Sequence, residues 1–104
     1  MSQNRKMLII YVDETDRYGE MPAYEAVVRK LLQLQIAGAT AMAGIMGFGS
    51  HHHVHRKRLL GVADDRPITI TAVDEEEKIR SVIPQIRHII PEGLIALMDI
   101  EIME

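Results

Sequence analysis

Short apolar runs and amphipathic helical segments follow one another along this chain in a definite order. Apolar residues recur at helical spacing twice, in residues 22–37 and 75–90. Four runs with the patterns of strands flank them, at residues 7–13, 39–49, 68–73 and 94–102. The predicted order is therefore strand, helix, strand, strand, helix, strand. Two right-handed crossovers in this order place both helices on one face of a four-stranded antiparallel sheet. The sequence thus predicts the α+β class with the ferredoxin-like βαββαβ arrangement, which by itself assigns no function.

The expected helix ends depend on particular residues. Pro22 stands where a first helical residue would stand, and Gly38 is a natural C-cap, so the first helix is expected to end by Gly38. Asp74 is the expected N-cap of the second helix, because three glutamates follow it and favour the positive end of the helix dipole. Pro84 lies inside that helix and predicts a kink rather than a break.

Length and composition indicate one cytoplasmic domain. A chain of 104 residues with 47% hydrophobic and 26% charged residues predicts a single domain over residues 1–104. The absence of cysteine excludes disulfides, thiolate metal sites and cysteine nucleophiles. The first apolar run is far shorter than a signal sequence or a membrane span. A net charge of −3, one Phe and no Trp argue against binding to nucleic acid.

The first strand is apolar on both of its faces. Leu8, Ile10 and Val12 alternate with Met7, Ile9 and Tyr11. Helices that cover one face of the sheet leave the other face exposed, and a second apolar face must be buried against something. A partner subunit is the simplest cover, so we expect a homo-oligomer.

The segment Gly44-Ile-Met-Gly-Phe-Gly carries the strongest functional signal. Glycines permit positive φ angles and let a ligand approach the backbone N–H groups, which is how phosphates are commonly bound. The segment matches neither the Walker pattern nor the dinucleotide-binding fingerprint. A bulged or bent strand end explains the same glycines equally well. Both interpretations stay open at this point.

Two polar clusters admit a chemical and a structural interpretation. His51, His52, His53 and His55 could bind a metal, but three cations flank them, and we favour an exposed, mobile loop over residues 50–58. Asp13, Glu14 and Asp16 could perform acid–base chemistry, but we favour a polar loop. Because no nucleophile with an adjacent base can be assembled, we expect no enzymatic activity.

Several motifs together identify a resemblance over nearly the whole chain. They are Leu-Ile-Ile-Tyr-Val-Asp-Glu-Thr-Asp from Leu8, Pro-Ala-Tyr-Glu from Pro22, Ala-Gly-Ala-Thr from Ala37, the glycine segment from Gly44, and Pro-Ile-Thr-Ile and Asp-Glu-Glu-Glu-Lys-Ile from Pro67 and Asp74. The chain resembles the small PII-like family of unknown function, which is related to nitrogen regulators. The resemblance implies a ferredoxin-like subunit, a homotrimer, and ligand sites in the clefts between subunits.

The resemblance also implies a ligand and a signalling role. In PII proteins a Gly-Phe-Gly opens the effector loop and its backbone contacts an adenine nucleotide; Gly47, Phe48 and Gly49 match this element. Residues 50–66 would then be the equivalent loop, read by a partner protein such as a membrane transporter. The nucleotide-binding residues implied are Gly44, Gly47, Phe48, Gly49, His55, Arg58 and Glu14, with Arg56 and Arg66 as alternative sources of positive charge for the phosphate.

The chain departs from the PII pattern in two ways. Only Pro91-Glu-Gly stands where PII proteins have a glycine-rich, lysine-ending phosphate loop, so we expect AMP or ADP rather than a triphosphate. The loop also lacks the tyrosine that is modified in PII proteins, so control by uridylylation is not expected. The alternative function is a metal-binding or metal-tolerance trimer of the same fold, with the histidines at residues 51–55 as ligands.

Overall fold

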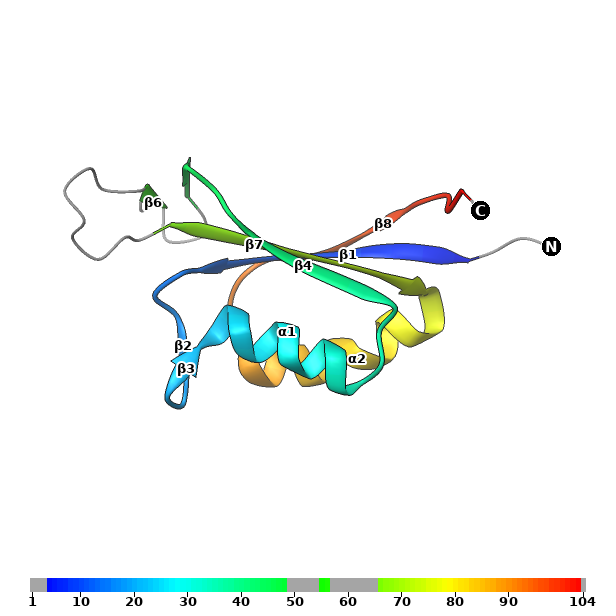
Figure 1. Cartoon of the computed structure of the whole chain (residues 1–104), viewed down its shortest axis with the longest axis horizontal. Coiled ribbons are helices and arrows are strands. Elements are labelled where there is room, and N and C mark those ends of the chain that lie inside the picture. The colour runs from blue at the N-terminus through cyan, green and yellow to red at the C-terminus, as the bar shows by residue number, and fades with distance from the viewer. Residues whose placement is uncertain (1–3, 49–54, 57–65, 104) are drawn as a thin grey trace.

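The computed structural model describes residues 4–48, 55–56 and 66–103. Its elements are β1 (Arg5–Asp13), β2 (Arg17–Tyr18), β3 (Met21–Pro22), α1 (Ala23–Gln33), β4 (Gly38–Ala43), β5 (Met46–Gly47), β6 (His55–Arg56), β7 (Pro67–Glu75), α2 (Glu76–Ile89) and β8 (Ile95–Asp99). The main sheet is antiparallel with the strand order β4-β7-β1-β8. Both helices cover one face of it (Figure 1). The predicted α+β, ferredoxin-like fold is confirmed.

The two central strands supply the sheet side of the core. β1 pairs with β7 along its whole length, from Arg5 opposite Glu75 to Asp13 opposite Pro67. Alternate residues of each strand point toward the helices. The residues on this face of the two strands are buried: Leu8, Ile10 and Val12 in β1, and Ile68, Ile70 and Ala72 in β7. The strand predicted over residues 68–73 is thereby confirmed.

Each helix packs an apolar stripe onto that face. The buried stripe of α1 comprises Ala23, Ala26, Val27 and Leu31, and that of α2 comprises Ile79, Val82, Ile86 and Ile89. These spacings of three and four residues keep one side of each helix against the sheet. α2 runs without a break through Pro84, as expected from the sequence. Among the described residues, no helix is long and apolar enough to cross a membrane.

The first helix ends earlier than predicted, and Gly38 is not its cap. α1 stops at Gln33, and Gln35 adopts the left-handed conformation, with a φ of 62°. The N–H of Ile36 donates to the carbonyl of Leu31 (3.1 Å), and the N–H of Gln35 donates to that of Leu32 (3.0 Å). These two bonds form a Schellman motif, in which Ile36 also covers Leu31. Gly38 instead begins β4.

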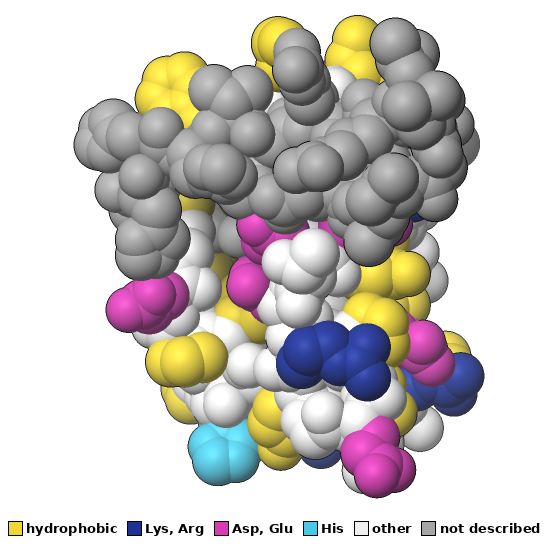
Figure 2. Space-filling model, turned by 90° about the vertical axis from the view of Figure 1, so that its left-hand side faces the viewer, with side chains coloured by type: hydrophobic (Ala, Val, Ile, Leu, Met, Phe, Trp, Pro, Cys, Tyr) yellow, Lys and Arg dark blue, Asp and Glu magenta, His cyan; other side chains and the backbone are white. Residues whose placement is uncertain are grey.

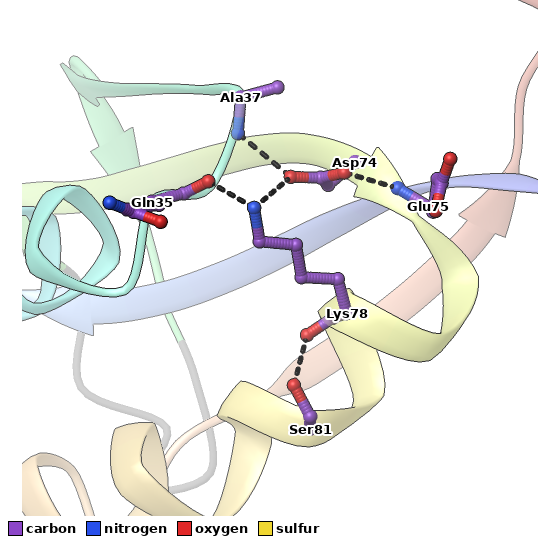
Figure 3. Close-up of polar contacts among 6 residues, drawn as sticks. All are labelled: Gln35, Ala37, Asp74, Glu75, Lys78 and Ser81. Atoms are coloured by element: carbon purple, nitrogen blue, oxygen red, sulfur yellow. Dashed lines mark hydrogen bonds and ion pairs between the residues drawn. The ribbon is translucent and has the colours of Figure 1, made fainter.

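Asp74 connects the end of α1 to the start of α2, and it is not the N-cap that the sequence predicts. The N-cap position is occupied by Glu75. The buried carboxylate of Asp74 accepts hydrogen bonds from the N–H of Ala37 (2.9 Å) and of Glu75 (2.7 Å), with Lys78 Nζ 3.4 Å away (Figure 3). Lys78 Nζ also donates to the carbonyl of Gln35. The polar group therefore holds the turn before β4 against the β7–α2 junction.

The second face of the sheet is uncovered by the described elements (Figure 1). By alternation it carries Met7, Ile9 and Tyr11 from β1 and Thr69 and Thr71 from β7. Met42 and Met98 extend it onto the edge strands, where they lie opposite Thr69 and Met7. Tyr11, Met42 and Met98 are exposed. The apolar second face predicted from the first strand is therefore present.

Edge and turn regions depart most from the sequence prediction. The predicted strand over residues 39–49 is divided, because the pairing of β4 with β7 ends at Ala43, opposite Ile68. Beyond it, the N–H of Gly44 still donates to the carbonyl of Pro67. β5 pairs instead with β6, which lies inside the stretch predicted to be a loop without strands. The last strand ends at Asp99 rather than near residue 102. A small β2–β3 hairpin, turning at Gly19 with a φ of 63°, was not predicted.

Candidate functional site

The glycine-rich segment lies against the first residue of β7. The N–H of Gly44 donates to the carbonyl of Pro67 (2.7 Å). A Cβ added to Gly44 would stand 2.9 Å from Pro67 Cγ, and one added to Gly47 would stand 3.3 Å from the same atom. A side chain at Gly44 would therefore clash with the proline ring, whereas one at Gly47 would fit only tightly against it. The structure supports the bent strand end for Gly44 and Gly47.

A bidentate ion pair stands beside this contact. Arg66 Nε donates to Glu14 Oε1 (2.9 Å), and its Nη2 donates to Glu14 Oε2 (2.5 Å). The N–H of Glu14 also donates to the carbonyl of Arg66 (2.9 Å). The side-chain hydrogen bond from Arg66 lowers the pKa of Glu14, and the positive charge of Arg66 adds to that effect. Both side chains are partly exposed, at 31% for Arg66 and 20% for Glu14, so the pair lies within reach of a ligand.

The acidic residues after β1 organise their own turn. Asp13 Oδ1 accepts hydrogen bonds from the N–H (2.8 Å) and the hydroxyl (2.9 Å) of Thr15. Asp16 Oδ2 accepts one from the N–H of Asp13 (3.1 Å), and the carbonyl of Asp16 accepts one from Ala23 at the start of α1 (2.7 Å). These bonds support the polar-loop interpretation of the acidic residues. Figure 2 shows Asp and Glu side chains in the middle of this end of the molecule.

Metal-binding geometry does not occur in the part of the chain that the structure describes. No group of three or more His, Asp or Glu side chains there is placed to hold a metal ion. His51, His52 and His53 lie outside the described residues. His55 is described through its backbone, which pairs with Gly47 across β5 and β6. The metal interpretation of the histidine cluster therefore remains a prediction.

The structure brings part of the predicted nucleotide site together. Gly44 and Gly47 contact Pro67, which follows Arg66, and Arg66 binds Glu14. Phe48 follows Gly47 in the chain, and its side chain is 69% exposed. The nearby apolar side chains of Ile45 and Met46 are also exposed, at 86% and 60%. Gly49 and Arg58 fall outside the described residues.

Pro67 and the partner of Arg66 were missed by the sequence analysis. The sequence did contain a signal for this contact. When β1 and β7 pair antiparallel, the acidic residues at the end of β1 lie beside Arg66 and Pro67 at the start of β7. The register itself could not be read from a single strand pattern. Arg66 was considered as a phosphate ligand, whereas its guanidinium is engaged by Glu14 in this structure.

The fold and the position of this group define a class of protein: a ferredoxin-like α+β subunit with an open apolar sheet face and a glycine-rich strand end. The chain belongs to the DUF190 family of uncharacterized ACR proteins, whose model matches residues 5–102. The match to one family over this range agrees with the resemblance stated from the sequence motifs.

Two relatives in the same size range are similar in sequence. A UPF0166 protein from Aquifex aeolicus is 28% identical over 101 residues, which are 95% of this chain and 93% of the relative. A UPF0166 protein from Methanocaldococcus jannaschii is 33% identical over 95 residues, which are 90% of this chain and 87% of the relative.

Solved structures of two kinds share the fold. CPII from Thiomonas intermedia K12, a nitrogen regulatory PII-like protein bound to ADP, AMP and bicarbonate, superposes with a TM-score of 0.69 at 22% identity, over 94% of this chain and 87% of that one. CutA1 from Ehrlichia chaffeensis, a divalent ion tolerance protein, gives a TM-score of 0.59 at 16% identity, over 100% of this chain and 86% of that one. At these identities the likeness shows the fold alone.

Proposed function

We propose that this protein is a non-catalytic, PII-like regulatory subunit of the cytoplasm. It forms a homotrimer, binds AMP or ADP in the clefts between subunits, and signals through residues 50–66 to a partner protein such as a membrane transporter. Binding changes the order of that loop because the ligand contacts one loop state better than the other. The observation that carries the proposal is the glycine segment at the end of a sheet whose second face is open and apolar.

Two features support a nucleotide at this position. Gly44 and Gly47 bring the backbone of the glycine segment close to the start of β7, which places the exposed ring of Phe48 at the same end of the sheet. The similarly folded CPII was solved with ADP and AMP bound. In our proposal Gly49 and Phe48 contact the nucleotide through their backbone, and loop arginines neutralise its phosphate.

Charge at the site limits which phosphate groups can bind. Asp13 ends β1, and Glu14 and Asp16 lie on the loop that follows it; these carboxylates would repel a highly charged anionic ligand. Both carboxylate oxygens of Glu14 bind the guanidinium of Arg66, so the charge of Glu14 offsets the attraction of Arg66 for a phosphate. A short phosphate chain paired with Arg58 or Arg56 therefore suits the site better than a triphosphate.

Calorimetry with AMP, ADP and ATP tests the proposal. Wild-type protein should bind AMP or ADP well below millimolar concentration and ATP more weakly. Gly49→Val should abolish binding, because a side chain there blocks the approach of the phosphate to the backbone. Gly38→Ala is the matched control, since its added methyl group meets no atom within 4 Å, and it should bind like wild type.

Two outcomes would reject the proposal. One is the absence of adenine nucleotide binding below millimolar concentration. The other is a Gly49→Val variant that binds as well as wild type. Titration with Zn²⁺ and Cu²⁺ covers the alternative function: stoichiometric metal binding that is lost when His51, His52 and His53 are replaced by Ala would favour the metal-tolerance interpretation.

A further inference from the structure

A pocket opens on the helix side of the molecule, away from the open sheet face. Its volume is about 240 Å³, and three separate elements contribute to it. The lining residues are Tyr18 from the β2–β3 hairpin, Lys30 from α1, and Pro84, Gln85, His88 and Ile89 from α2. The hairpin lies beside the helices in Figure 1. The pocket shares no residue with the glycine segment or with the Glu14–Arg66 pair.

The polar part of the pocket favours an anion. Lys30 brings an ammonium group, and its Nζ donates to the neutral amide of Gln33 (3.1 Å), so this contact leaves its positive charge uncompensated. His88 and Gln85 add groups that can donate hydrogen bonds. The six lining residues include no carboxylate. A carboxylate ligand would form a charge-assisted bond with Lys30, which is about twice as strong as a neutral hydrogen bond.

The apolar part of the pocket favours a small, flat body. The ring of Tyr18 meets that of His88 edge to face, with 6.2 Å between ring centroids and an interplanar angle of 73°. Pro84 has no N–H and presents only carbon atoms at its ring. Ile89 is 6% exposed and is anchored in the core, so this wall is rigid. The volume is below the roughly 300 Å³ at which pockets for drug-sized ligands begin.

We propose that this pocket binds a small organic anion with a flat apolar body, such as an aromatic carboxylate. The carboxylate lies toward Lys30 with Gln85 and His88 as further donors, and the flat body packs on Pro84 and Ile89. This site is separate from the proposed nucleotide site, so either proposal can fail without the other.

Titration with benzoate, followed by NMR of the backbone amides at constant pH and ionic strength, tests the site. Signals of Tyr18, Lys30 and His88 should shift and saturate, with a Kd of about 1 mM, as expected for a ligand of about nine non-hydrogen atoms. Benzamide, the neutral analogue of the same shape, should bind about tenfold more weakly because it cannot form the charge-assisted bond.

Substitutions make the test specific to the pocket. Lys30→Met should weaken benzoate binding about tenfold. Arg29→Met is the matched control, because it removes the same charge from the neighbouring residue, which pairs with Glu25 and does not line the pocket, and it should leave binding unchanged. Gln85→Trp places a large side chain in the pocket and should abolish benzoate binding. The backbone amide signals of this variant should remain dispersed, as in a folded protein.

Three results would overturn the proposal. Equal binding of benzoate and benzamide would remove the role of charge. Equal weakening by Lys30→Met and Arg29→Met would indicate a general charge effect. Benzoate shifts that do not saturate, or that map to residues 44–48 instead of to the pocket, would show that the pocket is not the site.

Discussion

At the scale of single residues, the glycine segment shows how one residue type serves two possible purposes. Glycine at position 44 or 47 could admit a ligand or could admit a neighbouring part of the chain. The proline ring at the start of β7 would clash with a Cβ at Gly44 and would pack tightly against one at Gly47. The sequence could not distinguish these reasons, because the contact with Pro67 joins residues twenty or more positions apart.

Gly44→Ala should destabilise the protein. The added Cβ would stand 2.9 Å from Pro67 Cγ, and the proline ring has little freedom to move away. Overpacking of this kind costs about 1 to 3 kcal/mol in the free energy of unfolding. Denaturant titration should show the loss for Gly44→Ala, whereas Gly38→Ala, at an open position of β4, should be close to neutral. Equal effects of the two substitutions would contradict the packing role of Gly44.

Asp74 makes the free energy of unfolding depend on pH in the acidic range. Burial raises its pKa, but the hydrogen bonds from the N–H groups of Glu75 and Ala37 and the charge of Lys78 outweigh burial, so the net pKa lies below the ordinary value of 3.8. A carboxyl group whose pKa is lowered by folding stabilises the folded state above its unfolded pKa. That contribution is lost as the pH falls through the ordinary value toward the folded one.

Asp74→Asn should therefore lower the free energy of unfolding by about 2 kcal/mol at pH 7, since it removes hydrogen bonds to a charged acceptor. The difference from wild type should shrink below about pH 4, where wild type also loses the charge. Urea unfolding at pH 7 and at pH 3 measures both values. Glu77→Gln, an exposed change near the start of α2, is the control. A difference that stays constant with pH would show that the charge of Asp74 is not responsible.

At the scale of elements, the end of α1 illustrates where local sequence signals compete. Gly38 is the obvious C-cap by residue type, yet the left-handed position falls on Gln35. Ile36 is buried when the helix ends at Gln33, and its N–H donates to the carbonyl of the buried Leu31. Lys78 binds the carbonyl of Gln35 and connects this turn to α2. These contacts favour the left-handed position at Gln35 over the conformational preference of Gly38.

Gln35→Gly should stabilise the protein by about 1 kcal/mol, because the left-handed conformation strains a residue with a Cβ by about that amount. The carbonyl that accepts from Lys78 is kept. Gln35→Val should have the opposite effect, since β-branched residues tolerate this conformation poorly. Thermal melting of the three proteins gives the order of stability. A melting temperature for Gln35→Gly below that of wild type would contradict the left-handed turn at this position.

Elements with strong periodicity could be predicted, and those that depend on tertiary contacts could not. β1, β7, α1 and α2 each carry a clear apolar alternation or stripe, and each was located within a few residues. The β2–β3 hairpin has two residues per strand and no periodicity to detect. Its position depends on contacts made after folding, including Tyr18 against His88 and Arg17 Nη2 donating to the carbonyl of Glu20 (2.5 Å).

At the scale of the whole molecule, two surfaces of the sheet point to association. The face opposite the helices carries methionines, Ile9 and Tyr11, and the edge strand β4 is exposed at every position and has no charged residue. Uncharged edge strands pair readily with other chains unless something protects them. The sequence predicted the apolar face from β1 alone.

Light scattering of the purified protein should give three times the subunit mass of 11.8 kDa, about 35 kDa. Ile9→Lys should reduce the mass, because Ile9 lies at the centre of the open face, between Thr71 of β7 and Ala96 of β8, where a charge would have to be buried in the assembly. Glu77→Lys, an exposed change on α2, should leave the trimer intact.

Because the nucleotide clefts are proposed to lie between subunits, Ile9→Lys should also lose AMP binding while the pocket beside Lys30 still binds benzoate. A wild-type monomer at micromolar concentration would contradict the trimer. An Ile9→Lys variant that still forms a trimer would show that the open sheet face is not buried between subunits.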